Sequence, residues 1–194
     1  MSRRKTNWYS LPPLQRQILI HLAKEGPKTR NEVAQELGSA YKNILFSFNS
    51  LKKKGLIKEI AEKKHRRRIF PKYWLTEEGV VLAFIEGASK DKLFETAKKF
   101  YLDDENLLYF IRFASLLNPQ VFKIGYDAVK RKGKLEPLDL TTIMLAQAES
   151  EVSMEKFKEG LMLLKEYPKL CESFKQIIKN WDKAMRLVSE VLES

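Results

Sequence analysis

The densest group of chemically active side chains in this sequence is basic. Residues 62–68 read EKKHRRR, a run too polar to be buried. Lysines and arginines at this density can neutralise phosphates, and an arginine on a protruding turn can enter a narrow, electronegative minor groove. A solvated surface turn would have the same composition. The candidate phosphate-binding residues here are Lys63, Lys64, His65, Arg66, Arg67 and Arg68.

The net charge of +11 is concentrated in the first part of the chain. Residues 1–87 hold 18 Lys and Arg against 8 Asp and Glu, a net +10, whereas residues 88–194 hold 18 against 17, a net +1. A unit that gathers positive charge repels itself, and a polyanion relieves that repulsion. The charge balance therefore indicates a nucleic acid as partner, with a merely soluble basic surface as the alternative.

No group of side chains indicates catalysis or metal binding. His21 and His65 have no Cys, Asp or Glu at metal-ligand spacing, and there is no phosphate-binding glycine loop and no nucleophile elbow. We therefore expect no enzyme activity, no metal and no cofactor. A single cysteine, Cys171, and the lack of an export signal favour the cytoplasm. The longest apolar run, residues 80–85, is far short of the roughly 20 residues that cross a bilayer, so we expect no membrane contact.

The elements that must position the basic run begin with three helices. Apolar spacing predicts a first helix that stops at Gly26. Thr29 and Glu32 have the spacing of a capping box and predict a short second helix. Ser39 is the expected cap of a third helix over residues 40–54, which Gly55 should end in a left-handed conformation.

A hairpin and a further helix follow. Residues 56–60 and 69–75 read as two strands, with Pro71 limiting the second to an edge position and the basic run as the connection between them. Thr76, with acidic residues directly after it, should begin a helix that ends at Gly87.

The order helix, helix, turn, helix, hairpin, helix resembles the winged helix-turn-helix superfamily, particularly regulators of the MarR and PadR families. The resemblance covers about residues 11–87 and rests on residues 51–57 (LKKKGLI) and 73–79 (YWLTEEG), with the basic run between them. It implies a DNA-binding domain over residues 1–87, in which the basic hairpin is the wing and the third helix enters the major groove.

The third helix supplies candidates for reading bases. If Ile44, Phe48 and Leu51 face the core, helical geometry turns the opposite face outward. No arginine lies on that face, which favours modest sequence discrimination or shape readout. Short hydroxyls and one arginine near helix N-termini, Thr29, Arg30 and Ser39, are candidate phosphate contacts. The candidate base-reading residues are Tyr41, Lys42, Asn43, Leu45, Phe46 and Asn49.

Residues 88–194 read as an all-helical bundle for dimerisation or regulation, so the chain as a whole should be mainly α. Residues 107–117 should form a buried central helix that begins after an acidic cluster at 103–105. The last segment carries an apolar stripe, which suits a bundle wall or a dimer helix equally. Four aromatic residues at helical spacing, Phe110, Phe113, Phe122 and Tyr126, could be plain core or line a pocket for a small-molecule effector, for which the sequence offers no further support.

Two functions fit these features. The first is a transcription regulator that binds double-stranded DNA as a homodimer paired through its C-terminal helices. The second is a winged-helix module that docks on protein in a chromosome-organising or other assembly, motivated by the outward Leu45 and Phe46.

Overall fold

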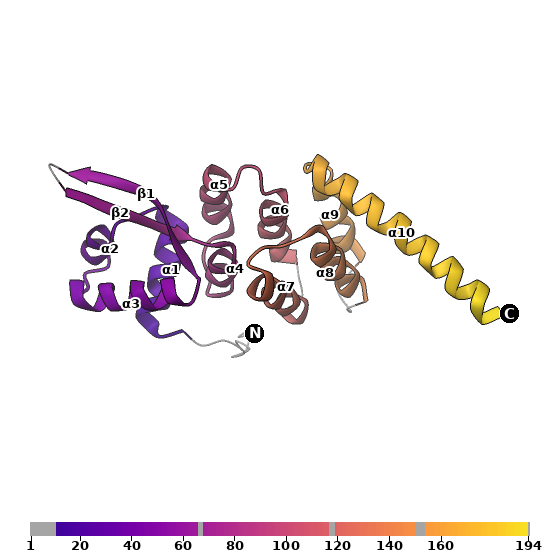
Figure 1. The fold of residues 1–194 in the computed structure, drawn as a ribbon, viewed down its shortest axis with the longest axis horizontal. Coiled ribbons are helices and arrows are strands. Elements are labelled where there is room, and N and C mark those ends of the chain that lie inside the picture. Colours follow the sequence, from indigo (N-terminus) through magenta and orange to yellow (C-terminus); the bar gives the residue numbers. More distant parts are fainter. Residues whose placement is uncertain (1–10, 66–67, 117–118, 150–153, 194) are drawn as a thin grey trace. The chain divides into compact units, whose positions relative to one another are not determined.

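The computed structural model describes residues 11–65, 68–116, 119–149 and 154–193 (Figure 1). The chain divides between Ser89 and Lys90 into an N-terminal and a C-terminal unit. This division lies two residues beyond the boundary that the sequence predicts. The expected fold class is confirmed: the described residues are mainly helical, and their two strands form one antiparallel hairpin.

Three helices open the N-terminal unit: α1 (Pro13–Glu25), α2 (Arg30–Glu36) and α3 (Tyr41–Lys53). The predicted capping box of α2 is present. The Thr29 hydroxyl accepts from the Glu32 backbone N–H at 3.3 Å, and the Glu32 carboxylate accepts from the Thr29 backbone N–H at 2.8 Å. These two bonds satisfy backbone donors that a helix start otherwise leaves open.

The predicted capping role of Ser39 is wrong. The residue that caps α3 is Ala40, and no side chain bonds to the first turn. Ser39 instead belongs to the end of α2, because its backbone N–H donates to the Ala34 carbonyl at 3.0 Å. The helix therefore starts one residue later than a serine cap requires. Its end is as predicted, since Gly55 adopts a φ of 73°.

One face of α3 is fixed in the core. Ile44, Phe48 and Leu51 are fully buried, as the 4,3 spacing predicts, and they lie among buried residues of α1. The Lys54 ammonium, just after α3, donates to Gln15 of α1 at 3.0 Å. Because burying each such apolar side chain contributes about 1.5–3 kcal/mol, this packing holds the orientation of α3 firmly.

The hairpin consists of β1 (Ile57–His65) and β2 (Arg68–Leu75). Its strands are longer than predicted, because the basic run, whose polarity predicts a loop, continues the ladder up to the pair His65 and Arg68. The ladder is formed by backbone hydrogen bonds, so a charged composition does not by itself prevent strand pairing. The far end projects beyond the helices of this unit (Figure 1).

The base of the hairpin is anchored in the core. Leu56 and Leu75 are buried, and the indole N–H of fully buried Trp74 donates to the Leu22 carbonyl of α1 at 2.9 Å. Lys28 and Tyr73 exchange two backbone hydrogen bonds of 3.2 and 2.9 Å, which tie the α1–α2 connection to β2. The rigid base therefore determines where the basic arms point.

The last helix of this unit is α4 (Glu77–Ile85). The Thr76 hydroxyl accepts from the Gly79 backbone N–H at 3.1 Å and donates to the Gly55 carbonyl at 2.6 Å. The predicted threonine cap is thus confirmed, and it also joins α4 to the end of α3.

The described residues of the C-terminal unit form helices joined by short connections. Asp104 caps α6, its carboxylate accepting from the Leu107 backbone N–H at 3.0 Å, so the acidic cluster begins a helix as predicted. The helices of this unit are α5 (Lys90–Phe100), α6 (Glu105–Phe113) with a single 3-10 turn (Ala114–Leu116), α7 (Pro119–Lys132), α8 (Pro137–Glu149), α9 (Met154–Leu164) and α10 (Pro168–Glu193).

The aromatic residues of α6 are core and do not line a pocket. Phe110 and Phe113 are buried, and two glycines allow neighbouring helices to approach their rings. A Cβ added at Gly125 would lie 2.8 Å from the Phe110 ring, and one added at Gly160 would overlap the Phe113 ring. Tyr126 is buried as well. The suggested effector pocket is therefore filled by close packing at the described members of that set, whereas the Phe122 side chain lies outside them.

The hydroxyl of Tyr109 gives this core a pH-dependent contact. It is fully buried and donates to the Gly160 carbonyl at 3.0 Å, with the Met144 sulfur 3.2 Å away. Burial raises the pKa of the Tyr109 phenol, and the neighbouring Tyr167 adds to that rise. The folded state therefore holds this proton at a pH where the unfolded chain has released it.

We predict that Tyr109→Phe loses about 1–2 kcal/mol of unfolding free energy near pH 8, because the Gly160 carbonyl loses a buried donor. As pH rises above about 10, the unfolded wild-type phenol ionises, so the wild type loses stability that the variant never had. Urea unfolding followed by circular dichroism at pH 8 and at about pH 11 should show the gap narrowing. A gap that stays constant would contradict the burial of the phenol.

Candidate nucleic-acid interface

The outward face of α3 carries most of the predicted base-reading residues. Phe46 and Tyr41 are the most prominent, with exposed fractions of 60% and 48%. Lys42, Asn43 and Asn49 are also exposed, whereas Leu45 is only partly so, because it lies at the edge of the buried face. Leu45 is therefore a weaker candidate for contact with a partner than the sequence suggests.

Two interactions order this face. The Lys42 ammonium lies 6.0 Å from the centre of the Phe46 ring, a cation–π contact within one turn of helix. Arg30, at the start of α2, donates through Nη2 to the Asn49 side-chain oxygen at 3.3 Å. Pairing of Asn49 with an adenine edge needs that same oxygen, so Arg30 must release it first.

Arg30 is a predicted phosphate contact near a helix N-terminus, and the structure gives it a more specific position. Its guanidinium lies 4.9 Å from the centre of the Tyr73 ring, and its Nε is buried with no acceptor among the described residues. Lys52 approaches the same ring at 5.9 Å, and Phe48 packs against it edge to face. The Tyr73 ring of β2 therefore brings together one cation of α2, Arg30, and one of α3, Lys52.

Burial raises the pKa of the Tyr73 phenol, although the Arg30 cation acts in the opposite direction. The phenol stays neutral, and the ring keeps the electron-rich face that attracts cations. The sequence pattern assigns Tyr73 no role. The one available signal is an aromatic residue directly before Trp74 in a strand, which does not reveal that its ring reaches α2 and α3.

The two remaining hydroxyl candidates differ in access. Thr29 is 5% exposed and its hydroxyl already accepts a capping bond, so its capping role leaves little surface for a phosphate. Ser39 lies half-buried at the turn after α2, with no capping bond of its own.

Most of the basic hairpin residues lie on the two paired strands. Lys63, Lys64 and His65 lie on β1, and Arg68 lies opposite His65 on β2. Arg66 and Arg67, which connect the strands, lie outside the described residues. The hairpin therefore brings basic residues of both arms together at its far end.

The last residue of α2, Glu36, is acidic and pairs with two basic neighbours. Glu36 accepts from the Lys28 ammonium at 2.7 Å and lies 2.5 Å from the His21 Nε2. Partial burial acts to raise the pKa of Glu36, but the bonds from Lys28 and His21 outweigh it and hold that pKa below its usual value. The hydrogen bond to Glu36 likewise raises the pKa of Lys28. The pairs leave the exposed face of α2 and α3 less acidic than the sequence suggests.

Metal binding and membrane insertion find no support in the described residues. No three His, Cys, Asp or Glu side chains among them lie close enough together to hold a metal ion. Within the same residues, no helix is both long and apolar enough to cross a membrane.

The element order and packing of the N-terminal unit define it as a winged helix-turn-helix. Two similar solved structures are a zinc-responsive MarR family member, ZitR of Lactococcus lactis, and wild-type ZitR of the same organism in complex with DNA. The first is 23% identical over 58% of this chain and 77% of that chain, with a TM-score of 0.38. The second is 22% identical over 58% and 76%, with a TM-score of 0.36. No protein-family model and no curated protein matches the chain, and a likeness at this level does not assign it to a family.

Proposed function

We propose that this protein is a transcription regulator that binds double-stranded DNA, with α3 in the major groove and the arms of the hairpin on phosphates or in the minor groove. The observation that carries the proposal is the division of α3 into two faces. One face is fully buried in the core, and the other presents Tyr41, Lys42, Phe46 and Asn49 to solvent. A fixed helix with an exposed polar and aromatic face suits insertion into a groove that admits one helix.

The charge distribution supports the same proposal. Nearly all the net positive charge lies in residues 1–87, and Arg30 and Lys52 gather on Tyr73 beside α3. The C-terminal unit would pair two copies, and the regulator would work without catalysis in the cytoplasm, where Cys171 stays reduced. Two-fold pairing would favour a near-palindromic DNA site with half-sites roughly 34 Å apart.

Fluorescence anisotropy with a labelled random duplex at rising salt tests the proposal. If five basic side chains neutralise phosphates, the logarithm of affinity should fall against the logarithm of salt concentration with a slope of about −4.5. The matching single strand is the control and should bind more weakly, because it offers no groove for α3. Affinity that ignores salt, or equal affinity for the duplex and the single strand, would refute binding to duplex DNA.

A protein-docking module is the second candidate, because Phe46 and Tyr41 expose large aromatic surfaces on α3. Aromatic residues are enriched in protein interfaces, and they also contact thymine methyl groups. The anisotropy experiment separates the two functions, since a docking module has no reason to bind a random duplex in a salt-dependent way.

A further inference from the structure

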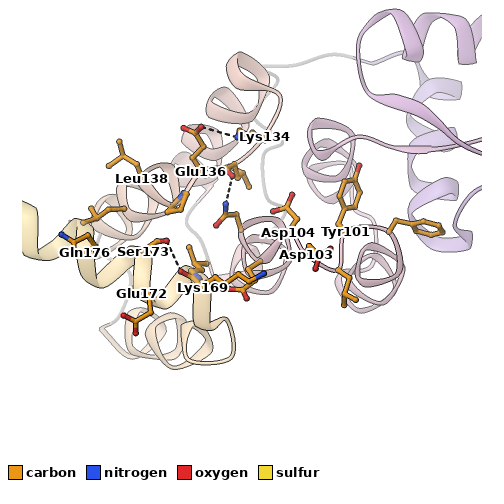
Figure 2. Close-up of a pocket in the computed structure, with 18 residues that line it drawn as sticks. Tyr101, Asp103, Asp104, Lys134, Glu136, Leu138, Lys169, Glu172, Ser173 and Gln176 are labelled. Atoms are coloured by element: carbon orange, nitrogen blue, oxygen red, sulfur yellow. Dashed lines mark hydrogen bonds and ion pairs between the residues drawn. The ribbon is translucent and has the colours of Figure 1, made fainter.

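The C-terminal unit contains a large groove that the proposed DNA binding does not use. It has a volume of about 1140 Å³ and is formed by the α5–α6 connection, the α7–α8 connection and the first turns of α10. Figure 2 shows Asp103 and Asp104 on the first of these segments, Leu138 at the start of α8, and Glu172 and Gln176 on α10.

The size and chemistry of the groove fit a protein segment better than a small molecule. Pockets for small molecules have about 300–1,000 Å³ and few polar groups. This groove is larger and is lined by five carboxylates, those of Asp103, Asp104, Glu105, Glu136 and Glu172, against the two cations Lys134 and Lys169. Two of these carboxylates also accept backbone hydrogen bonds, Asp104 from Leu107 and Glu105 from Leu170.

Large apolar side chains at the groove are left open to solvent. Leu102 is 66% exposed and Leu138 is 56% exposed. Both contribute to the groove lining. They give the groove exposed apolar area that a partner helix with apolar side chains can cover.

The helix α10 has an apolar stripe that is buried over its first part only. Leu170 is 1% exposed, and Phe174 and Ile177 are partly buried. The stripe continues along the same face, but there Ile178 and Trp181 are exposed by 42% and 55%. In Figure 1 the second half of α10 extends away from the other helices of its unit. At 1.5 Å per residue, residues 178–193 extend about 24 Å.

The first turns of the exposed half of α10 carry charge complementary to that of the groove. From Ile178 to Arg186, α10 carries Lys179, Lys183 and Arg186 and a single acid, Asp182, which pairs with Arg186 at 2.9 Å. The groove has an excess of three carboxylates over its cations. Glu190 and Glu193 follow only in the last turns of the helix.

We propose that the second half of α10 of one copy lies in the groove of a second copy, and that the second copy does the same in return. Trp181 and Ile178 would cover Leu102 and Leu138 of the other chain, while Lys179 and Lys183 would face its carboxylates. The same two patches meet twice, so the arrangement closes as a two-fold dimer and does not grow further. This inference rests on the pairing proposed above and is independent of DNA binding.

The arrangement differs from a coiled coil of two α10 helices, because it requires the groove. Two variants separate the roles. Leu102→Lys with Leu138→Lys disables the groove, and Ile178→Glu with Trp181→Glu disables the helix. All four side chains are exposed, so both variants should fold. Met162→Lys, at an exposed apolar residue of α9 outside the groove, is the matched control.

Sedimentation velocity should show a wild-type dimer and a control dimer. Each double variant should raise the dimer dissociation constant by about 100-fold, as removal of buried aromatic and aliphatic anchors does. An equimolar mixture of the two double variants should recover part of the dimer, because one intact groove then meets one intact helix. Circular dichroism checks that each variant is folded.

Three results would overturn the inference: a wild type that stays monomeric, a groove variant that pairs like the wild type, or a mixture that pairs no better than its components. Duplex affinity of the same variants is measured independently by the anisotropy experiment. Monomeric variants keep α3 and the hairpin, so they should still bind duplex DNA in a salt-dependent way. A dimer that ignores DNA would refute the proposed function alone.

Discussion

Replacing Lys63, Lys64, Arg66, Arg67 and Arg68 together by glutamine should lower the affinity for a random duplex by about 10³-fold at low salt. The salt slope should shrink by about 0.9 for each phosphate that the variant no longer neutralises. The anchored base of the hairpin, with Trp74 and Leu75 buried, does not include these residues, so the fold should persist. Anisotropy titrations over a range of salt concentrations measure both quantities.

A control variant that loses the same number of positive charges elsewhere separates the effect of their position on the hairpin from the effect of the protein's net charge. Lys92, Lys98, Lys99, Lys123 and Lys156 are exposed on helices of the C-terminal unit. Replacing these five by glutamine should change duplex affinity by only about threefold, because they belong to the C-terminal unit, whereas the proposed phosphate contacts belong to the N-terminal unit. Equal decreases in the two variants would mean that DNA responds to overall charge and that the hairpin has no special role.

Much of the N-terminal fold could be predicted, because its signals are local. The capping box of Thr29 and Glu32, the end of α3 at Gly55 and the cap of Thr76 each involve residues a few positions apart. The extent of the hairpin could not be predicted from polarity, since the two strands stay paired up to His65 and Arg68 in spite of a register shift between Glu59 and Ala61. Ser39 shows that a serine before a helix is not always its cap. Its backbone N–H donates to the Ala34 carbonyl at the end of α2, and its side chain does not cap α3.

The arrangement of the candidate interface depends on contacts that are distant in sequence. Nothing near Arg30 in the sequence indicates that its guanidinium stacks on Tyr73 and holds the oxygen of Asn49. The stripe of α10 has a similar ambiguity. Its spacing is equally compatible with packing inside the bundle and with packing against a partner helix. Only the exposure of Ile178 and Trp181 shows where packing inside the bundle ends.

The junction between α4 and the hairpin leaves no room for a side chain at Gly79. A Cβ built there would overlap the Leu56 carbonyl oxygen, with the Leu56 carbonyl carbon at 3.0 Å and the Leu75 Cβ at 3.3 Å. The obstacle is backbone, which cannot rotate away as a flexible side chain can. The same Leu56 carbonyl accepts from the Thr76 backbone N–H at 3.1 Å, so the base of the hairpin and the start of α4 would have to separate.

We therefore predict that Gly79→Ala destabilises the N-terminal unit by about 3 kcal/mol or more, the upper range for overpacking of a core. Gly55→Ala is the matched control: its added Cβ meets nothing within 4 Å, and it suffers only from a φ of 73°. A left-handed backbone costs a non-glycine residue about 1–2 kcal/mol. Urea unfolding followed by circular dichroism should give a clearly lower free energy of unfolding for Gly79→Ala than for Gly55→Ala. The junction between α4 and the hairpin would be distorted in Gly79→Ala. Duplex affinity should therefore fall even at urea concentrations at which the variant is still folded. Equal stability of the two variants would mean that α4 can move without disturbing the wing.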